Sequence, residues 1–206
     1  MKIDFNKKLK DFYKPSGKVP AIIKVPEMQY LEIRGEGFPD KHSDFQETFP
    51  ALYSVAYTLK FLFKGKRAPK GWKDWTMTPP EALWWMKGNK PFDKNQKKNW
   101  RWAVILMVPD FITNDLVKQV KKIVKEKKNP TLLPKLKLTT LKEGMCVTMM
   151  HVGSYDDVGC TLNVMETFAE EHGYKFAGKH HEIYLTRPNV KPEKTKTALR
   201  MPIIKK

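Results

Sequence analysis

Hydrophobic and polar positions alternate along some stretches of the chain and follow a helical period along others. Alternation over residues 100–108 predicts a strand with Trp100, Trp102, Val104, Leu106 and Val108 on one face, because successive strand side chains point to opposite faces. A helical period predicts one helix from Asp44 onward and another over residues 111–127. A further helix is predicted between Gly153 and Gly173. The remaining predicted strands are 28–37, one strand or a bent pair within 75–86, 135–141, 145–151, 181–186 and 199–204.

The order of these elements repeats along the chain. From Met28, and again from Met145, a strand, a glycine turn, a helix and two strands follow one another. We expect an α+β fold in which duplicated strand–helix–strand–strand units form an antiparallel sheet, with two helices on one face and pseudo-twofold symmetry. The expected parts are an N-terminal arm (1–26) and a domain (27–206) with repeats at 27–109 and 140–206, joined by a helical segment at 110–139.

Each predicted repeat carries a glutamate in an otherwise apolar strand, Glu81 in the first and Glu182 in the second. Alternation places Glu182 and Tyr184 on one face of their strand. From spacing alone, Glu182 is either a solvated edge-strand residue or the acid of a pocket. A carboxylate among aromatic rings pairs with cationic ligands, or acts as a general acid or base when its pKa is raised. A cleft between the repeats would receive both glutamates.

Composition narrows the class of protein. The 206 residues are 41% hydrophobic and 12% aromatic, which is typical of a globular chain with a core. No apolar run reaches about 18 residues, so we expect no membrane partner. Two cysteines, Cys146 and Cys160, indicate a reduced, cytoplasmic protein. The net charge of +17 favours nucleic acid or an acidic partner, but the lysines are spread without a nucleic-acid-binding motif, so we expect a solvated surface.

No motif predicts a metal or another cofactor. His180 and His181 are adjacent, so they point apart in a strand, and no metal-binding spacing accompanies them. The tryptophans are either core residues or ligand-stacking surfaces. Trp85, on the face of Glu81, and Trp102, in the neighbouring strand, are the candidate stacking residues. Tyr155 is a third candidate, and it is otherwise a turn residue that covers the end of a helix.

Two segments resemble a known family. His151-Val152-Gly153-Ser154-Tyr155 resembles the His-x-Gly-Pro-Tyr turn of GyrI-like small-molecule-binding domains, with serine in place of proline. The run from His180 to Leu185, followed by 192–194 and 199–203, resembles their C-terminal signature. The resemblance covers about residues 26–206 and implies the same duplication. It also implies that Glu182 is the pocket acid, and it transfers less directly to Glu81.

The resemblance implies a free-standing member that binds bulky lipophilic, aromatic or cationic small molecules. Some free-standing relatives hydrolyse cyclopropane-containing DNA-alkylating compounds. We therefore expect a detoxifying hydrolase in which Glu182 deprotonates water, Tyr184 donates a hydrogen bond to the ligand and Glu81 is the second acid–base group. The alternatives are a non-catalytic multidrug-binding or sequestering protein, and a basic protein that acts on DNA or gyrase. The sequence leaves the oligomeric state open.

Overall fold

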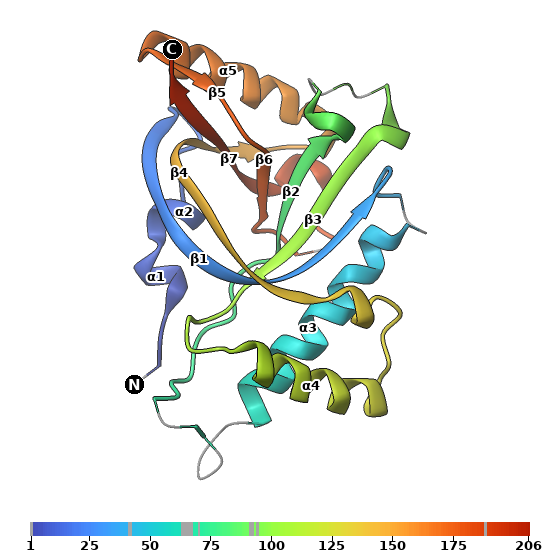
Figure 1. Cartoon of the computed structure of the whole chain (residues 1–206). Helices are drawn as coiled ribbons and strands as arrows, with labels where there is room; N and C mark the ends of the chain where they lie inside the picture. The colour runs from blue at the N-terminus through green and yellow to red at the C-terminus, as the bar shows by residue number, and fades with distance from the viewer. Residues whose placement is uncertain are drawn as a thin grey trace. The chain divides into compact units, whose positions relative to one another are not determined.

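The structure is a computed structural model that describes residues 2–40, 43–62, 68–69, 71–90, 93, 95–187 and 189–206. It has a mixed α+β fold with antiparallel strand ladders (Figure 1). The helices are α1 (Phe5–Lys8), α2 (Lys10–Tyr13), α3 (Asp44–Leu62), α4 (Asn114–Lys127) and α5 (Val158–Glu171). The strands are β1 (Ala21–Glu36), β2 (Glu81–Met86), β3 (Trp100–Met107), β4 (Lys137–Val152), β5 (Tyr174–Phe176), β6 (His180–Tyr184) and β7 (Lys196–Lys205). No helix among the described residues is long and apolar enough to cross a membrane.

The order of elements agrees with the predicted repeat. β1, α3, β2 and β3 are followed, after α4, by β4, α5, β6 and β7, with the short β5 as an unpredicted addition. β4 joins the strands predicted at 135–141 and 145–151 into one. The internal duplication, its pseudo-twofold symmetry and the boundaries drawn from them stay predictions.

The chain forms two compact units, which are described separately. The first unit comprises Met1–Phe5, Met28–Pro80 and Trp85–Leu141. In it, residues 30–36 of β1 pair with residues 101–107 of β3. Gly35 lies opposite Trp102, and a Cβ atom at Gly35 would come within 2.2 Å of the indole ring, which explains the glycine. The predicted helix at 111–127 begins later, at Asn114, because the Thr113 side chain accepts a hydrogen bond from the amide of Leu116 and caps it.

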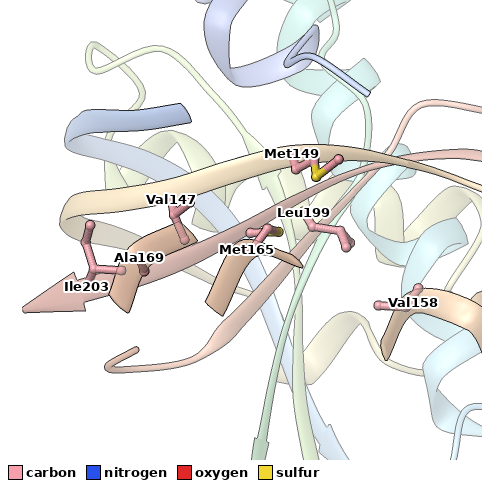
Figure 2. Close-up of a cluster of buried hydrophobic side chains, with 7 residues drawn as sticks. All are labelled: Val147, Met149, Val158, Met165, Ala169, Leu199 and Ile203. Carbon is pink, nitrogen blue, oxygen red and sulfur yellow. The ribbon is translucent and has the colours of Figure 1, made fainter. Parts of the chain in front are cut away.

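The second unit comprises Asn6–Glu27, Glu81–Trp84 and Lys142–Lys206. β7 pairs with β4 along one edge and with β6 along the other, and β6 pairs with residues 81–84 of β2. β5 pairs with the end of β7. α5 packs on one face of this sheet, and Figure 2 shows the buried residues that fill the contact: Val147, Met149, Val158, Met165, Ala169, Leu199 and Ile203. The opposite face of the same sheet carries charged residues, as described below.

Candidate functional site

An acidic centre lies where β2 and β6 pair in the second unit. The register sets Ala82 opposite Glu182 and Trp84 opposite His180, so these side chains share one face with Tyr184. The Glu182 side chain is only 13% exposed, and its Oε1 lies 3.0 Å from Nε2 of His180. Its Oε2 accepts hydrogen bonds from the Tyr184 hydroxyl at 2.8 Å and from the Trp84 indole N–H at 3.2 Å. We call these four side chains (Trp84, His180, Glu182 and Tyr184) the Glu182 centre.

The Glu182 centre holds an ionised carboxylate next to a protonated phenol. Burial acts to raise the pKa of Glu182, but the hydrogen bond and charge of His180, with the bonds from Tyr184 and Trp84, lower that pKa overall. Burial and the negative charge of Glu182 raise the pKa of Tyr184 well above its ordinary value. Glu182 is therefore a fixed negative charge at neutral pH. The Tyr184 proton is already donated to Glu182, which differs from its expected use as a donor to the ligand.

The turn before α5 places a further aromatic ring beside the centre. His151 lies at the end of β4, and its Nε2 is 2.9 Å from the carbonyl oxygen of Ser154, which fixes the turn. A Cβ atom at Gly153 would lie 3.3 Å from the same nitrogen, and Gly153 has a φ of +150°. Tyr155 follows, 54% exposed, with its ring edge-on to Tyr184 at a centroid distance of 5.8 Å. The structure thus brings Tyr155, Glu182 and Tyr184 into one locality.

Glu81 lies on the other face of the sheet. It pairs directly with Ile183, the neighbour of Glu182, and consecutive strand residues point to opposite faces. The structure therefore does not bring Glu81 and Glu182 together, contrary to the expectation that both acids share one cleft. The cause is the register of β2 against β6, which depends on pairing across 96 to 102 positions of the chain and leaves no local trace in the sequence.

Glu81 instead belongs to a buried ionic cluster with Glu143, His181 and Arg200. Nε2 of His181 lies 2.8 Å from Glu81, and its Nδ1 lies 2.9 Å from Glu143. Arg200 Nη2 lies 2.7 Å from Glu143 and 3.8 Å from Glu81, and the four side chains are at most 3% exposed. The Tyr13 hydroxyl, from α2, donates a hydrogen bond to Glu81 at 3.2 Å. The predicted arm at 1–26 thus supplies a buried side chain to the second unit.

The pKa values of this cluster predict a limited pH range of maximum stability. Burial acts to raise the pKa of Glu143, but the charges and hydrogen bonds of His181 and Arg200 lower it from 4.5 to about 2. Burial acts to lower the pKa of His181, but Glu143 and the hydrogen bond to Glu81 raise it above 6.5. Glu143 therefore stabilises the fold above pH 4.5, and this contribution is lost as the pH falls toward about 2. The contribution of His181 is complete below pH 6.5 and is lost as the pH rises through its raised folded-state value.

Because of this cluster, the Tm of the protein is expected to be highest between pH 4.5 and 6.5 and to decrease on both sides, which thermal unfolding at a series of pH values measures. Glu143→Gln removes the acid-sensitive group, so the variant is less stable at pH 6 and its Tm falls less between pH 4.5 and about 2. If the Tm of the variant fell as much as that of the wild type over this pH range, the role given to Glu143 would be contradicted.

The candidate stacking tryptophans lie in the first unit. Trp102 is fully buried, and its ring meets Phe45 edge-on at a centroid distance of 5.3 Å, which is typical of core packing. Trp85 is partly buried. Their roles as ligand-stacking surfaces stay predictions. Trp84, which the sequence reasoning passed over, contacts Glu182. Trp85 was preferred because it shares a face with Glu81, and the face of Glu182 carries Trp84 instead.

His180 was also missed as a site residue. The available signal was the alternation of 180, 182 and 184 along β6, which puts His180, Glu182 and Tyr184 on one face. Among the described residues, no group of His, Cys, Asp and Glu is arranged to hold a metal ion. Burial raises the pKa of the Cys146 thiol to about 12, so Cys146 stays a protonated, unreactive thiol.

Comparisons with known proteins agree with this fold. Residues 19–204 match the family model of the GyrI-like small-molecule-binding domain. Two hydrolases of Listeria innocua, at 38% and 36% identity, superpose with TM-scores of 0.89 and 0.87, covering 99% and 98% of this chain and 100% of theirs. An uncharacterised conserved protein of Listeria innocua is similar at 38% identity, with a TM-score of 0.89 and coverage of 98% and 100%. No curated protein sequence gives a significant match.

Proposed function

This chain belongs to the GyrI-like small-molecule-binding family, and we propose that it binds bulky, flat, lipophilic molecules at the Glu182 centre and hydrolyses electrophilic, cyclopropane-containing ones. One observation carries the proposal: an ionised, largely buried carboxylate is held by three donors beside aromatic rings. The similar Listeria innocua proteins described as hydrolases support the enzymatic part. Detoxification of such electrophiles in the cytoplasm would be the biological role.

Aromatic rings and a fixed charge fit such a ligand physically. Tyr155, which is 54% exposed, and the partly buried Tyr184 offer ring faces and edges to a flat molecule, and stacking adds about 0.5–1.5 kcal/mol per pair beyond the area buried. Trp84 is buried and holds Glu182 through its indole N–H. The negative charge of Glu182 attracts a cationic ligand, or positive charge that develops on an electrophile. We assign Glu81 no part in the reaction, because it lies on the opposite face of the sheet.

The proposed reaction is addition of water to a cyclopropane conjugated with a carbonyl group. The water oxygen bonds to a ring carbon, the strained carbon–carbon bond breaks, and its electron pair moves to the carbonyl oxygen. The water proton passes to a base and then to that oxygen, so one water is consumed and no oxidant or reductant is needed. A positioned acid–base group accelerates such a step on the order of 10²–10⁴-fold.

A sequestering protein is the second candidate, because the lowered pKa of Glu182 suits a permanent counter-ion for cationic drugs. Turnover separates the two functions. The protein is mixed with a large molar excess of a cyclopropane-conjugated enone, and the hydrated product is followed by mass spectrometry. We expect product to exceed protein in molar terms and to keep accumulating. Protection that stops at one equivalent would identify a binder, and an unaltered electrophile would contradict the hydrolase.

A further inference from the structure

Neighbouring histidines on β6 have opposite environments. Both ring nitrogens of His181 lie within ion-pair distance of a carboxylate in the buried ionic cluster, Nε2 at 2.8 Å from Glu81 and Nδ1 at 2.9 Å from Glu143. His180 points to the other face, and its Nε2 lies 3.0 Å from Oε1 of Glu182. Its Nδ1 is buried and has no hydrogen-bond partner within the described part of the chain. A buried nitrogen without a partner costs about 1–3 kcal/mol and therefore requires an explanation, of which a catalytic role is one.

The protonation of His180 follows from its partner. An ionised carboxylate only accepts hydrogen bonds, so Nε2 of His180 carries the proton that lies between them. In the neutral ring, Nδ1 then keeps a free lone pair. A carboxylate that holds one imidazole nitrogen fixes the tautomer and stabilises the imidazolium that forms when the other nitrogen takes a proton. His180 and Glu182 have this arrangement.

Glu182 is less suited to take the proton itself. Three donors already occupy its oxygens, His180 on Oε1 and both Tyr184 and Trp84 on Oε2. A carboxylate offers about four acceptor sites, so little capacity remains for a water. Its lowered pKa also makes it a weak base.

We infer that His180 is the general base of the proposed hydrolysis, and that Glu182 acts through it as a positioning residue and counter-charge. Nδ1 of His180 accepts a proton from water as the water oxygen bonds to the cyclopropane carbon. The ring bond breaks toward the conjugated carbonyl, and the imidazolium returns the proton to the resulting enolate oxygen. The balance is one water added across one carbon–carbon bond. This assignment rests on the proposed hydrolytic function.

His180→Gln tests the assignment, since its side-chain amide keeps a donor toward Glu182 but offers no basic nitrogen. We expect kcat to fall on the order of 10²–10⁴-fold with KM changed by less than about threefold. Adding Glu182→Gln to His180→Gln should cost little more, because residues that act as one unit are not additive. His172→Gln, at an exposed histidine, is the matched control and should turn over normally.

A second variant separates loss of the base from loss of the folded structure. His180→Ala leaves space beside Glu182, and its turnover should rise with added imidazole if the missing group is a base. The role of His180 would be overturned if a folded His180→Gln protein had the kcat of the wild type. It would also be overturned if a folded but inactive His180→Ala protein were not rescued by imidazole. Neither outcome would overturn the hydrolytic function. Absence of turnover in the wild type would overturn the hydrolytic function and this inference with it.

Discussion

Glu182→Gln is expected to lower kcat/KM for a cyclopropane electrophile on the order of 10²–10⁴-fold while leaving the fold intact. The amide has the size of the carboxylate but no charge, so it no longer stabilises a cation on His180 or on the ligand. At least one of the donors Tyr184 and His180 also loses its acceptor, because half of the amide is itself a donor. The loss should appear mainly in kcat for a neutral substrate.

Steady-state kinetics measures kcat/KM of Glu182→Gln, and quenching of tryptophan fluorescence measures ligand binding to the same variant. A neutral aromatic ligand should bind almost as well as to the wild type, whereas a lipophilic cation should bind more weakly. Glu193→Gln, at an exposed glutamate, is the matched control and should change neither. Normal turnover by folded Glu182→Gln would remove the Glu182 centre from the reaction.

Arg200→Met is expected to cause the largest loss of stability. Arg200 is 1% exposed and lies 2.7 Å from Glu143, so its removal leaves two buried carboxylates facing one imidazole. Removal of one partner from a buried ion pair costs about 3–5 kcal/mol. For a chain of this length, the corresponding decrease in Tm is on the order of 10 °C, which thermal unfolding measures directly.

Two further variants identify the cause of the loss of stability. Lys206→Met breaks an ion pair with Glu170 that is about half exposed on both sides, and should cost at most about 1 kcal/mol. The double variant Arg200→Met with Glu143→Gln removes one of the two carboxylates and should be more stable than Arg200→Met alone. If the two losses simply add, lost packing rather than charge would explain the effect.

The sequence indicated which side chains share one face of β6. Alternation within one strand put Glu182 and Tyr184 on one face, and the same rule places His180, two residues before Glu182, on that face as well. The turn at residues 151–155 and the strand at 180–185 were enough to indicate the family. These features depend on residues close in the chain, whose relative directions the backbone fixes without knowledge of distant partners.

Errors arose where two distant strands had to be aligned. Pairing Glu81 with Glu182 assumed that two similar strands present their acids to the same space, whereas the register sets Glu81 beside Ile183. A shift of one residue exchanges the two faces of a strand, and alternation within either strand is unchanged by it. The preference for Trp85 over Trp84 followed from the same assumption.

The sequence alone indicated the α+β class, the family, and the side of β6 on which Glu182 and Tyr184 lie. It did so because backbone periodicity and short motifs depend on residues that are close in the chain. Only the tertiary structure separated the two acids, one into an aromatic centre and the other into a cluster with His181 and Arg200. That separation depends on hydrogen-bonded pairing between strands about 100 residues apart, where burial and register, rather than residue type, decide which side chains meet.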